Sequence, residues 1–320
     1  MQRLAMSILV RDEADVIEWN IRFHASQGVD YFIVMDNGST DGTREILENL
    51  RSDVDLEILD EPSRSFDQDL WVTKMAFHVR ETARADFMIA ADADEFWHSN
   101  TGTLKSDFQT SHAASGHGKW GDGSADNSVF LCSRYNMLPR FTDLKIPHYM
   151  FSDNIMKVAR PFGIHKNAPD PEEKLDFGIM LRTMPAKVMC SLKGLKSVGM
   201  GNHSVEHESG APVQSPTIQI YHYPLRTYAQ FEKKVVNQGA ALTSNKRFDE
   251  GTGWHTRRWY ALYRQGKLRE EYELMVLQDQ QVRDLIRRGI LQEDFTLKNA
   301  LQSLEGQGNG GSMSLSPGKE

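Results

Sequence analysis

Short apolar runs alternate with amphipathic segments along the first hundred residues of the chain. Four of these runs have the length and composition of buried strands, and they cover residues 4–10, 31–35, 56–59 and 87–91. Between the runs, apolar residues recur at helical spacing within residues 13–27, 43–50 and 67–84. Asp12 and Asp41 are expected to cap the first two helices. The alternation predicts an α/β fold with a largely parallel sheet and helices on both faces.

The pattern changes after Trp97. Residues 99–127 are rich in Gly, Ser, His and Asp, which predicts a variable insertion with at most one short helix near residues 104–110. Residues 163–217 are expected to be rich in loops. Strand-like runs stand on either side of that stretch, at residues 129–132, 155–159 and 218–221.

Regular apolar spacing returns in the last third of the chain, where residues 225–242 and 254–291 are expected to be helical. The sequence therefore predicts an α/β domain of residues 1–224 and a helical C-terminal region of residues 225–305. Residues 306–320 are rich in Gly, Ser and Pro and are expected to form a disordered tail.

Charge and cysteine content narrow the class of protein. A formal net charge of −7 argues against a general nucleic-acid binder. Two cysteines, Cys132 and Cys190, exclude a disulfide scaffold and suit a reducing compartment. The first residues lack the pattern of a signal peptide, and no stretch has the length of a membrane span. We therefore expect a cytoplasmic protein, with an association at the inner face of a membrane left open.

The main chemical signal is an acidic motif at the end of the fourth strand. Residues 86–97 read DFMIAADADEFW, so the buried run leads directly into Asp92, Asp94 and Glu95. Three adjacent carboxylates repel one another and call for a positive partner. A hard divalent cation is the natural candidate, and Asp92 and Asp94 point to the same side of an extended chain. The alternative is a solvated acidic turn.

A second polar segment, DNGSTDGT, follows the second strand at residues 36–43. Asp36 stands at the strand tip, and the turn through Gly38 exposes backbone amides before a helix, a good place for a ribose or a phosphate. A capped turn and a loose calcium loop are the alternatives. Because ligands of such sheets lie beyond the carboxyl ends of the strands, we expect both segments at one edge.

The two motifs, in this order and together with residues 4–12, resemble those of the family 2-like glycosyltransferases of the GT-A fold, most closely the branch with a DADEFW-type motif. The resemblance implies a mixed sheet flanked by helices and a hexosyltransferase activity that uses a nucleotide-diphosphate sugar with Mn²⁺ or Mg²⁺. It also implies that Asp36 holds the nucleoside and that Asp92 and Asp94 bind metal and donor. Three residues are expected near the nucleoside: Val10, Arg11 and Glu13.

Other residues are candidates from chemistry and position alone. Inverting transfer needs a general base for the acceptor hydroxyl. We expect this base to be an acid or a histidine that follows the acidic motif in the sequence. The candidate bases are Asp153, His203 and Glu206. His222 is a candidate third metal ligand. The alternative, to which we give the same weight, is a histidine that only forms a structural hydrogen bond. Residues expected near the phosphates are Arg226, Gln68 and Lys74, and a solvated helix face is the alternative for Lys74.

Rival functions remain open at this point. A nucleotidyltransferase would need a glycine-rich basic loop after the first strand, where this chain has Arg11-Asp12-Glu13-Ala14. A phosphohydrolase with an aspartate nucleophile would carry its acidic motif after the first strand instead of the fourth. A sugar-binding module without activity is not excluded. For a transferase, the acceptor is a glycan, a lipid or a protein, since a fold does not choose among them.

Overall fold

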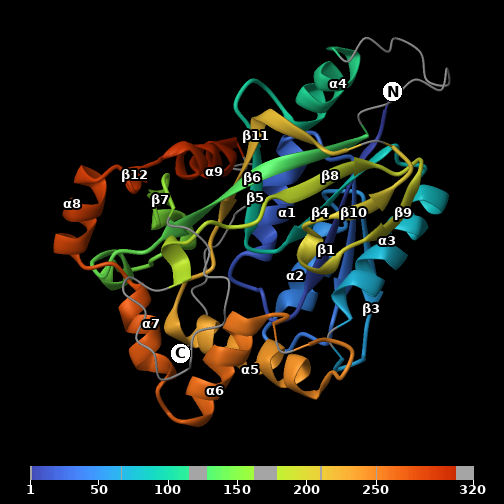
Figure 1. Ribbon diagram of the computed structural model, residues 1–320. Coiled ribbons are helices and arrows are strands. Elements are labelled where there is room, and N and C mark those ends of the chain that lie inside the picture. The colour runs from blue at the N-terminus through green and yellow to red at the C-terminus, as the bar shows by residue number, and fades with distance from the viewer. Residues whose placement is uncertain are drawn as a thin grey trace. The chain divides into compact units, whose positions relative to one another are not determined.

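The computed structural model describes residues 2–65, 67–114, 128–161, 179–209, 211–249 and 251–307 (Figure 1). The chain forms two compact units. The first contains residues 1–63, 67–134 and 185–221, and the second contains residues 64–66, 135–184 and 222–320. The units interleave along the chain, whereas the sequence suggested a single boundary near residue 224.

A central parallel sheet organises the first unit. Strand β1 (Leu4–Val10) pairs in parallel with β2 (Tyr31–Asp36) on one side and with β4 (Phe87–Asp92) on the other. Strand β3 (Leu56–Asp60) pairs in parallel with β2, and β8 (Lys187–Ser191) pairs with β4 in the antiparallel sense. The order β8-β4-β1-β2-β3 makes a mixed sheet with four parallel strands.

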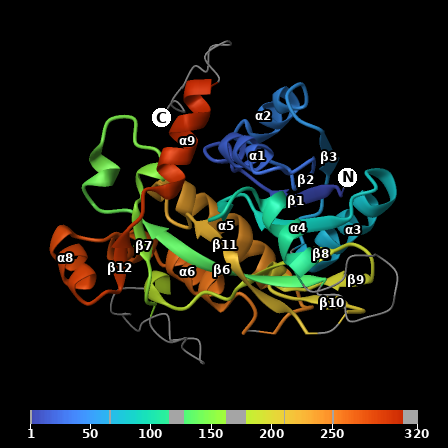
Figure 2. The ribbon, with the colours of Figure 1, turned by 90° about the horizontal axis from the view of Figure 1, so that it is seen from above.

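Helices cover both faces of this sheet. Helix α3 (Gln68–Thr82) packs Met75, Ala76 and Val79 against Ile33 and Met88, which share one face of the sheet. Figure 2 shows α1 (Ile17–Ser26) and α2 (Thr43–Leu50) on the opposite side of β1, β2 and β3 from α3. Strands covered on both faces are apolar throughout, which is why their runs stand out in the sequence. Each fully buried aliphatic side chain contributes about 1.5–3 kcal/mol.

The rest of the first unit consists of shorter elements. Strand β5 (Glu95–Ser99) and helix α4 (Leu104–Ala114) follow β4, and β6 (Val129–Leu138) pairs with β8 through its first residues. The remaining elements are β9 (Leu195–Val198), the 3₁₀ helix η4 (Met200–Asn202), β10 (Val205–His207) and β11 (Val213–His222). The prediction of a loop-rich stretch at residues 163–217 is wrong for its described part. Strands of three to five residues are too short to show periodicity in the sequence.

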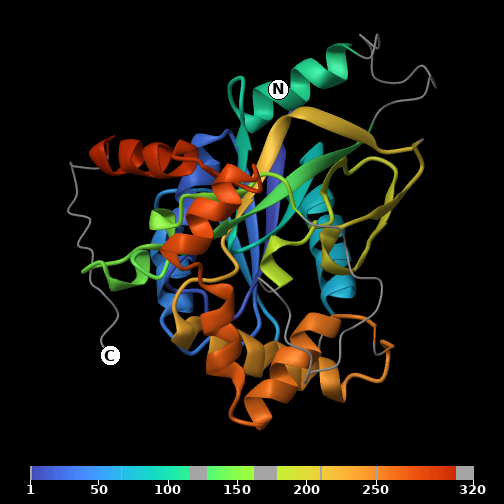
Figure 3. The same ribbon diagram turned by 60° about the vertical axis from the view of Figure 1, so that its left-hand side comes forward.

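The second unit is mainly helical. Its helices are α5 (Tyr228–Ser244), α6 (Trp254–Arg264), α7 (Leu268–Met275), α8 (Asp279–Arg287) and α9 (Thr296–Gln307). Its smaller elements are η1 (Asp143–Lys145), η2 (Phe151–Asp153), η3 (Ile179–Leu181), β7 (Met156–Val158) and β12 (Leu291–Glu293). Figure 3 shows α5, α6 and α7 as neighbouring orange helices. Phe231, Trp259 and Tyr272 of these helices form an aromatic cluster.

The expected fold class, a mixed α/β sheet flanked by helices with a helical C-terminal region, is confirmed. One correction concerns residues 254–291, which form three helices and part of a strand, because Gly266 with φ of +73° ends α6. Helix α4 extends four residues beyond the expected short helix. The expected insertion beyond residue 114 and the tail beyond residue 307 lie outside the described residues. Among the described helices, none is long and apolar enough to cross a membrane.

Substitution by alanine should have opposite effects on stability at two helical glycines. A Cβ on Gly239 of α5 would lie 2.4 Å from the Cβ of Tyr260, whereas a Cβ on Gly306 of α9 would meet open space. We expect Gly239→Ala to destabilise the protein by about 1–3 kcal/mol through overpacking. Gly306→Ala should be neutral or stabilise by up to about 1 kcal/mol through helix propensity. Urea unfolding checks both, and equal effects would contradict the packing of α5 against α6.

Candidate functional site

The strand register brings the polar strand ends of the first unit to one edge of the sheet. Val10 of β1 pairs with Asp36 of β2, and Asp36 pairs with Asp60 of β3. On the other side of β1, Leu9 pairs with Asp92 of β4. Neighbouring strands lie about 4.8 Å apart, so the backbones at Asp36 and Asp92 are separated by about 10 Å across β1. Acidic side chains from three strands therefore share the carboxyl edge of one sheet.

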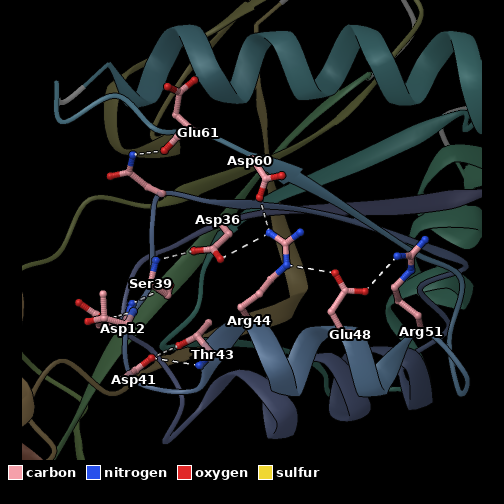
Figure 4. A network of polar contacts seen from close by, with 12 residues as sticks. Asp12, Asp36, Ser39, Asp41, Thr43, Arg44, Glu48, Arg51, Asp60 and Glu61 are labelled. Carbon is pink, nitrogen blue, oxygen red and sulfur yellow. Dashed lines mark hydrogen bonds and ion pairs between the residues drawn. The ribbon is translucent and has the colours of Figure 1, made fainter.

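Two loops at this edge are tied together by side-chain hydrogen bonds (Figure 4). The Asp12 carboxylate accepts from the backbone amide of Thr40 at 2.7 Å, and the amide of Asp12 donates to Ser39 Oγ at 3.0 Å. Asp12 has φ of +59° and is buried, a conformation that costs free energy for a residue other than glycine. The prediction that Asp12 caps the first helix is wrong, because its side chain binds the second loop and α1 begins only at Ile17.

Asp41 fixes the beginning of α2. Its Oδ1 accepts from the Thr43 amide at 3.0 Å and from the Thr43 hydroxyl at 2.5 Å, while its Oδ2 accepts from the Ala14 amide at 3.2 Å. Gly42, with φ of +98°, is the N-cap residue of α2. Asp41, one residue before the N-cap, accepts the hydrogen bond of the first helical amide, that of Thr43. Thr43 Oγ1 also accepts from the Glu13 amide at 2.8 Å.

Asp36 is buried and its two oxygens have different partners. Oδ1 accepts from the Ser39 amide at 2.9 Å, and Oδ2 lies 3.7 Å from the guanidinium of Arg44. Arg44, from the first turn of α2, also contacts Asp60 and reaches Glu48 Oε1 at 3.1 Å (Figure 4). These contacts hold the Asp36 carboxylate rigidly at the tip of β2, and a preorganised carboxylate is suited to bind hydroxyl or N–H donors of a ligand.

The acidic motif turns sharply instead of staying extended. Strand β4 ends at Asp92, Ala93 and Asp94 form a turn, and β5 begins at Glu95. The expectation that Asp92 and Asp94 share one side of an extended chain is therefore wrong. The side chain of Asp92 is 34% exposed, whereas Asp94 and Glu95 are buried. Asn20 stabilises the turn by donating to the carbonyls of Ala93 at 2.8 Å and Glu95 at 2.9 Å.

Two basic residues that the sequence did not single out neutralise much of the motif. The Lys187 ammonium lies 2.8 Å from Asp92 Oδ2 and 3.0 Å from Glu95 Oε1, and its side chain is 0% exposed. Arg134 of β6 lies 2.7 Å from the same oxygen of Glu95. Burial raises the pKa of Glu95, and the charges of Lys187 and Arg134 act in the opposite direction. Three carboxylates facing two cations leave one negative charge.

The carboxylates of the acidic motif supply only part of the oxygen ligands that a divalent cation needs. Among the described residues, no group of three or more His, Cys, Asp or Glu side chains is arranged to hold a metal ion. The carboxylate oxygens of Asp92 and Asp94 are nevertheless ligands that Mn²⁺ and Mg²⁺ accept. The remaining single negative charge also suits a cation that arrives with a diphosphate. The chain thus fits such an ion only if the diphosphate provides further ligands.

The two residues expected on α3 differ in position. Gln68, in its first turn, is buried and donates from Nε2 to Asp92 Oδ1 at 3.3 Å. Lys74, further along α3, is exposed, which agrees with the alternative of a solvated helix face. Trp97, the last residue of the motif segment, is fully buried and belongs to the core.

Of the three candidate bases, His203 lies in the electrostatic field of the acidic motif. Its Nδ1 is 2.9 Å from the carbonyl of Ala186, the residue before Lys187. Because a carbonyl only accepts, Nδ1 carries the proton and Nε2 keeps its lone pair. Burial lowers the pKa of His203 to about 4, with contributions from Lys187 and Arg134. The imidazole is therefore neutral at pH 7.

The other two candidate bases have structural contacts. Asp153, in the second unit, accepts from the Met150 amide at 2.9 Å and pairs with Lys298 at 2.9 Å. Glu206 of β10 has a side chain that is 68% exposed and lies 3.9 Å from Lys196. These contacts match the alternative in which polar loop residues bind locally.

His222 and Arg226 belong to the second unit. His222 is buried at the end of β11, and its Nδ1 lies 2.7 Å from Asn136 Oδ1. Asn136 in turn donates to the Met180 carbonyl at 2.8 Å, so its oxygen faces the imidazole. Nδ1 therefore carries the proton and Nε2 keeps a lone pair, which is the form a metal ligand needs. Arg226 is buried, and its carbonyl accepts from the Tyr272 hydroxyl at 2.8 Å.

Comparison with known proteins assigns the class. Residues 6–262 match the family model of glycosyltransferase family 92, which is most of the 320-residue chain. The chain is thus a glycosyltransferase. The chain belongs to glycosyltransferase family 92. The predicted class is confirmed, whereas the narrower assignment to family 2-like enzymes with a DADEFW-type motif is not. No curated protein matches the sequence.

The solved structures that match the chain are distant in sequence. The crystal structure of S. aureus TarS 1–349 is 14% identical, covers 99% of this chain and 95% of that chain, and gives a TM-score of 0.41. The complex of the same protein with UDP-GlcNAc is 12% identical, with the same coverage and TM-score. Glucosyl-3-phosphoglycerate synthase from Mycobacterium tuberculosis, in complex with Mg²⁺ and UDP, is 16% identical, covers 42% of this chain and 44% of that chain, and gives 0.28.

Proposed function

We propose that this glycosyltransferase moves a hexose from a nucleotide-diphosphate sugar to an acceptor hydroxyl, with inversion and with the help of Mn²⁺ or Mg²⁺. The observation that carries the proposal is the register of the sheet. It brings Asp36 and Asp92 to the carboxyl edge of neighbouring parallel strands, on either side of β1. Ligands of α/β sheets bind at that edge. A nucleotidyltransferase that forms nucleotide sugars is disfavoured because the family is one of glycosyltransferases.

The nucleoside half of the donor is assigned to the loops after β1 and β2. Asp36 would accept hydrogen bonds from the nucleoside, and the backbone at Gly38 would approach the ribose. The loops cannot easily move apart, because Asp12 and Asp41 link them through three hydrogen bonds: Thr40 donates to Asp12 from its amide and its hydroxyl, and the Ala14 amide donates to Asp41. The residues of β1 and its loop that would line this part of the site are Val10, Arg11 and Glu13.

The diphosphate half is assigned to the acidic motif. When bound, the divalent cation neutralises charge that develops on the leaving diphosphate. Asp92 and Asp94 would hold this ion together with diphosphate oxygens. Gln68 orients Asp92 through its 3.3 Å hydrogen bond. The sequence-based roles of His222, as a metal ligand, and of Arg226, as a cation for the phosphates, stay predictions. Lys74 is exposed on its helix, and its place near the phosphates stays a prediction.

His203 is the residue that we assign to remove the acceptor proton, since Asp153 and Glu206 have structural contacts. His203→Gln is expected to lower kcat by about 10²–10⁴-fold, the usual contribution of a general base. Because the pKa of His203 is lowered to about 4, wild-type kcat/KM should stay constant towards lower pH and decline only as the pH falls through that value. The matched control is His207→Gln, because His207 also contacts a backbone carbonyl, that of Ser191. An unchanged rate in His203→Gln would contradict the assignment.

A donor screen tests the function as a whole. Nucleotide sugars are incubated with the protein and Mn²⁺, and the hydrolysis or transfer products are identified by mass spectrometry. We expect one donor to be consumed, and consumption to be lost in Asp94→Ala while the melting temperature of the variant stays close to that of the wild type. A donor that stabilises the fold without being consumed would favour a sugar-binding module instead.

The acceptor and the location are also proposals. A glycan, a lipid or a protein each offers the required hydroxyl, and nucleic acid is disfavoured by the net charge of −7. We propose that the protein works in the cytoplasm, where nucleotide sugars are available, with peripheral binding at the inner face of a membrane if the acceptor is a lipid.

A further inference from the structure

We infer that Lys187 is a positioning residue for sugar transfer. In this role its ammonium holds the Asp92 carboxylate in place and limits the negative charge that the acidic motif presents to an incoming cation. The inference rests on the proposed function, because it assigns Lys187 a task within the same site. It goes beyond the donor and metal residues, none of which explains why a lysine with 0% exposed side chain lies between the carboxylates of Asp92 and Glu95.

The position of Lys187 follows from the strand register. Strand β8 runs antiparallel to β4, with Ile89 opposite Met189 and Met88 opposite Cys190. Continuing this register puts Lys187 level with Ala91, one residue before Asp92. On its other side β8 pairs with β6, where Cys132 lies opposite Lys187. The lysine is therefore built into the sheet, between the motif strand and the strand that carries Arg134.

The contacts show that Lys187 acts through other residues. Its ammonium touches Asp92 Oδ2 at 2.8 Å and Glu95 Oε1 at 3.0 Å. Full burial prevents it from touching a donor directly. Asp92, by contrast, is 34% exposed, and its second oxygen is held by Gln68 at 3.3 Å. A buried cation on one oxygen and an amide on the other fix the rotamer of the exposed carboxylate.

Charge provides a second effect that can be separated from position. With Lys187 and Arg134 present, the three carboxylates retain one negative charge. Lys187→Met raises this to two and removes one of the two contacts that fix the rotamer of Asp92, so a free cation should bind more tightly while transfer slows. A double variant, Lys187→Met with Glu95→Gln, restores the charge of one but still lacks the lysine contact to Asp92. The pair of variants therefore separates charge from positioning.

The experiment measures two quantities on the full chain. One is the dissociation constant of Mn²⁺ alone, by isothermal titration calorimetry, and the other is kcat for donor hydrolysis. For Lys187→Met we expect Mn²⁺ to bind about tenfold more tightly, because a cation next to the ligand carboxylate is gone. We expect kcat to fall about 100-fold, since misplacing a catalytic group by about 1 Å has that effect. The double variant should return to wild-type Mn²⁺ affinity and keep the low kcat.

The matched control is Lys105→Met. Lys105 is a partly buried lysine of the first unit that also pairs with an aspartate: it lies 2.7 Å from Asp30, which precedes β2 at the opposite end of the sheet. Its Mn²⁺ affinity and kcat should equal those of the wild type.

Three results would overturn the inference. They are unchanged values in Lys187→Met, a joint loss of Mn²⁺ binding and turnover in it, and wild-type kcat in the double variant. The joint loss would show a merely structural lysine. If the wild-type chain itself neither binds Mn²⁺ nor consumes a donor, the proposed function fails and the inference fails with it. Wild-type turnover with an unaffected Lys187→Met would overturn the inference alone.

Discussion

Asp92→Asn is expected to lower kcat for donor hydrolysis and transfer by about 10³-fold, the upper range for losing one preorganised electrostatic group. Asp92 is the exposed carboxylate of the acidic motif, and Lys187 and Gln68 hold it from two sides. Asparagine keeps the shape of the side chain but removes the charge that faces the cation and its diphosphate. The free energy of unfolding should change little, because Lys187 keeps its contact with Glu95.

Steady-state kinetics with the consumed donor measures this effect, and circular dichroism verifies the fold. Asp55→Asn is the matched control, since Asp55 is an exposed carboxylate that pairs with Arg3 before β3, at the opposite end of the sheet. Asp55→Asn should retain wild-type kcat. Equal activity in Asp92→Asn and Asp55→Asn would show that the acidic edge does not carry the reaction.

Glu95→Ala should produce the largest change in stability, a loss of about 3–5 kcal/mol in the free energy of unfolding. Glu95 is 0% exposed and lies within 3.0 Å of Lys187 and 2.7 Å of Arg134. Removing it leaves Arg134 buried without this carboxylate and Lys187 with Asp92 only. A buried ion pair is a weak source of net stability, but deleting one partner is costly because the other charge stays desolvated.

Urea unfolding at pH 7 measures the loss. Glu48→Ala is the control, because Glu48 also contacts two arginines, Arg44 and Arg51, but does so at the surface of α2. Its effect should lie within experimental error, since surface pairs contribute little. A shift for Glu95→Ala as small as that for Glu48→Ala would mean that water reaches the motif and that its charges are not buried.

Strands β1, β2 and β4 could be predicted from sequence because their burial on both faces leaves continuous apolar runs, whereas β3, at the edge of the sheet, is only partly buried. Strand β1 was predicted with its observed bounds, and β2, β3 and β4 each extend one residue further, to an aspartate. Those three aspartates are the acidic tips of the site. Parallel pairing then fixes which tips meet, since the carboxyl ends of the strands share one edge.

The basic partners of the motif could not be found in the same way. Lys187 and Arg134 belong to antiparallel strands that meet β4 only through long-range pairing, and β8 has just five residues. A lysine at the head of the apolar run Val188-Met189-Cys190 was the one local signal for Lys187. Similarly, the turn at Ala93 and Asp94 depends on Asn20, which is 73 residues away in the sequence. Periodicity does not report contacts of this kind.

The most direct test of the central claim is a crystal structure of the protein with Mn²⁺ and a nucleoside diphosphate, chosen from UDP, GDP and ADP by thermal shift. The account predicts the nucleoside beside Asp36 and the loops after β1 and β2, and the diphosphate with its cation beside Asp92 at the end of β4. A nucleotide bound away from this edge of the sheet, or one that contacts neither Asp36 nor Asp92, would contradict it.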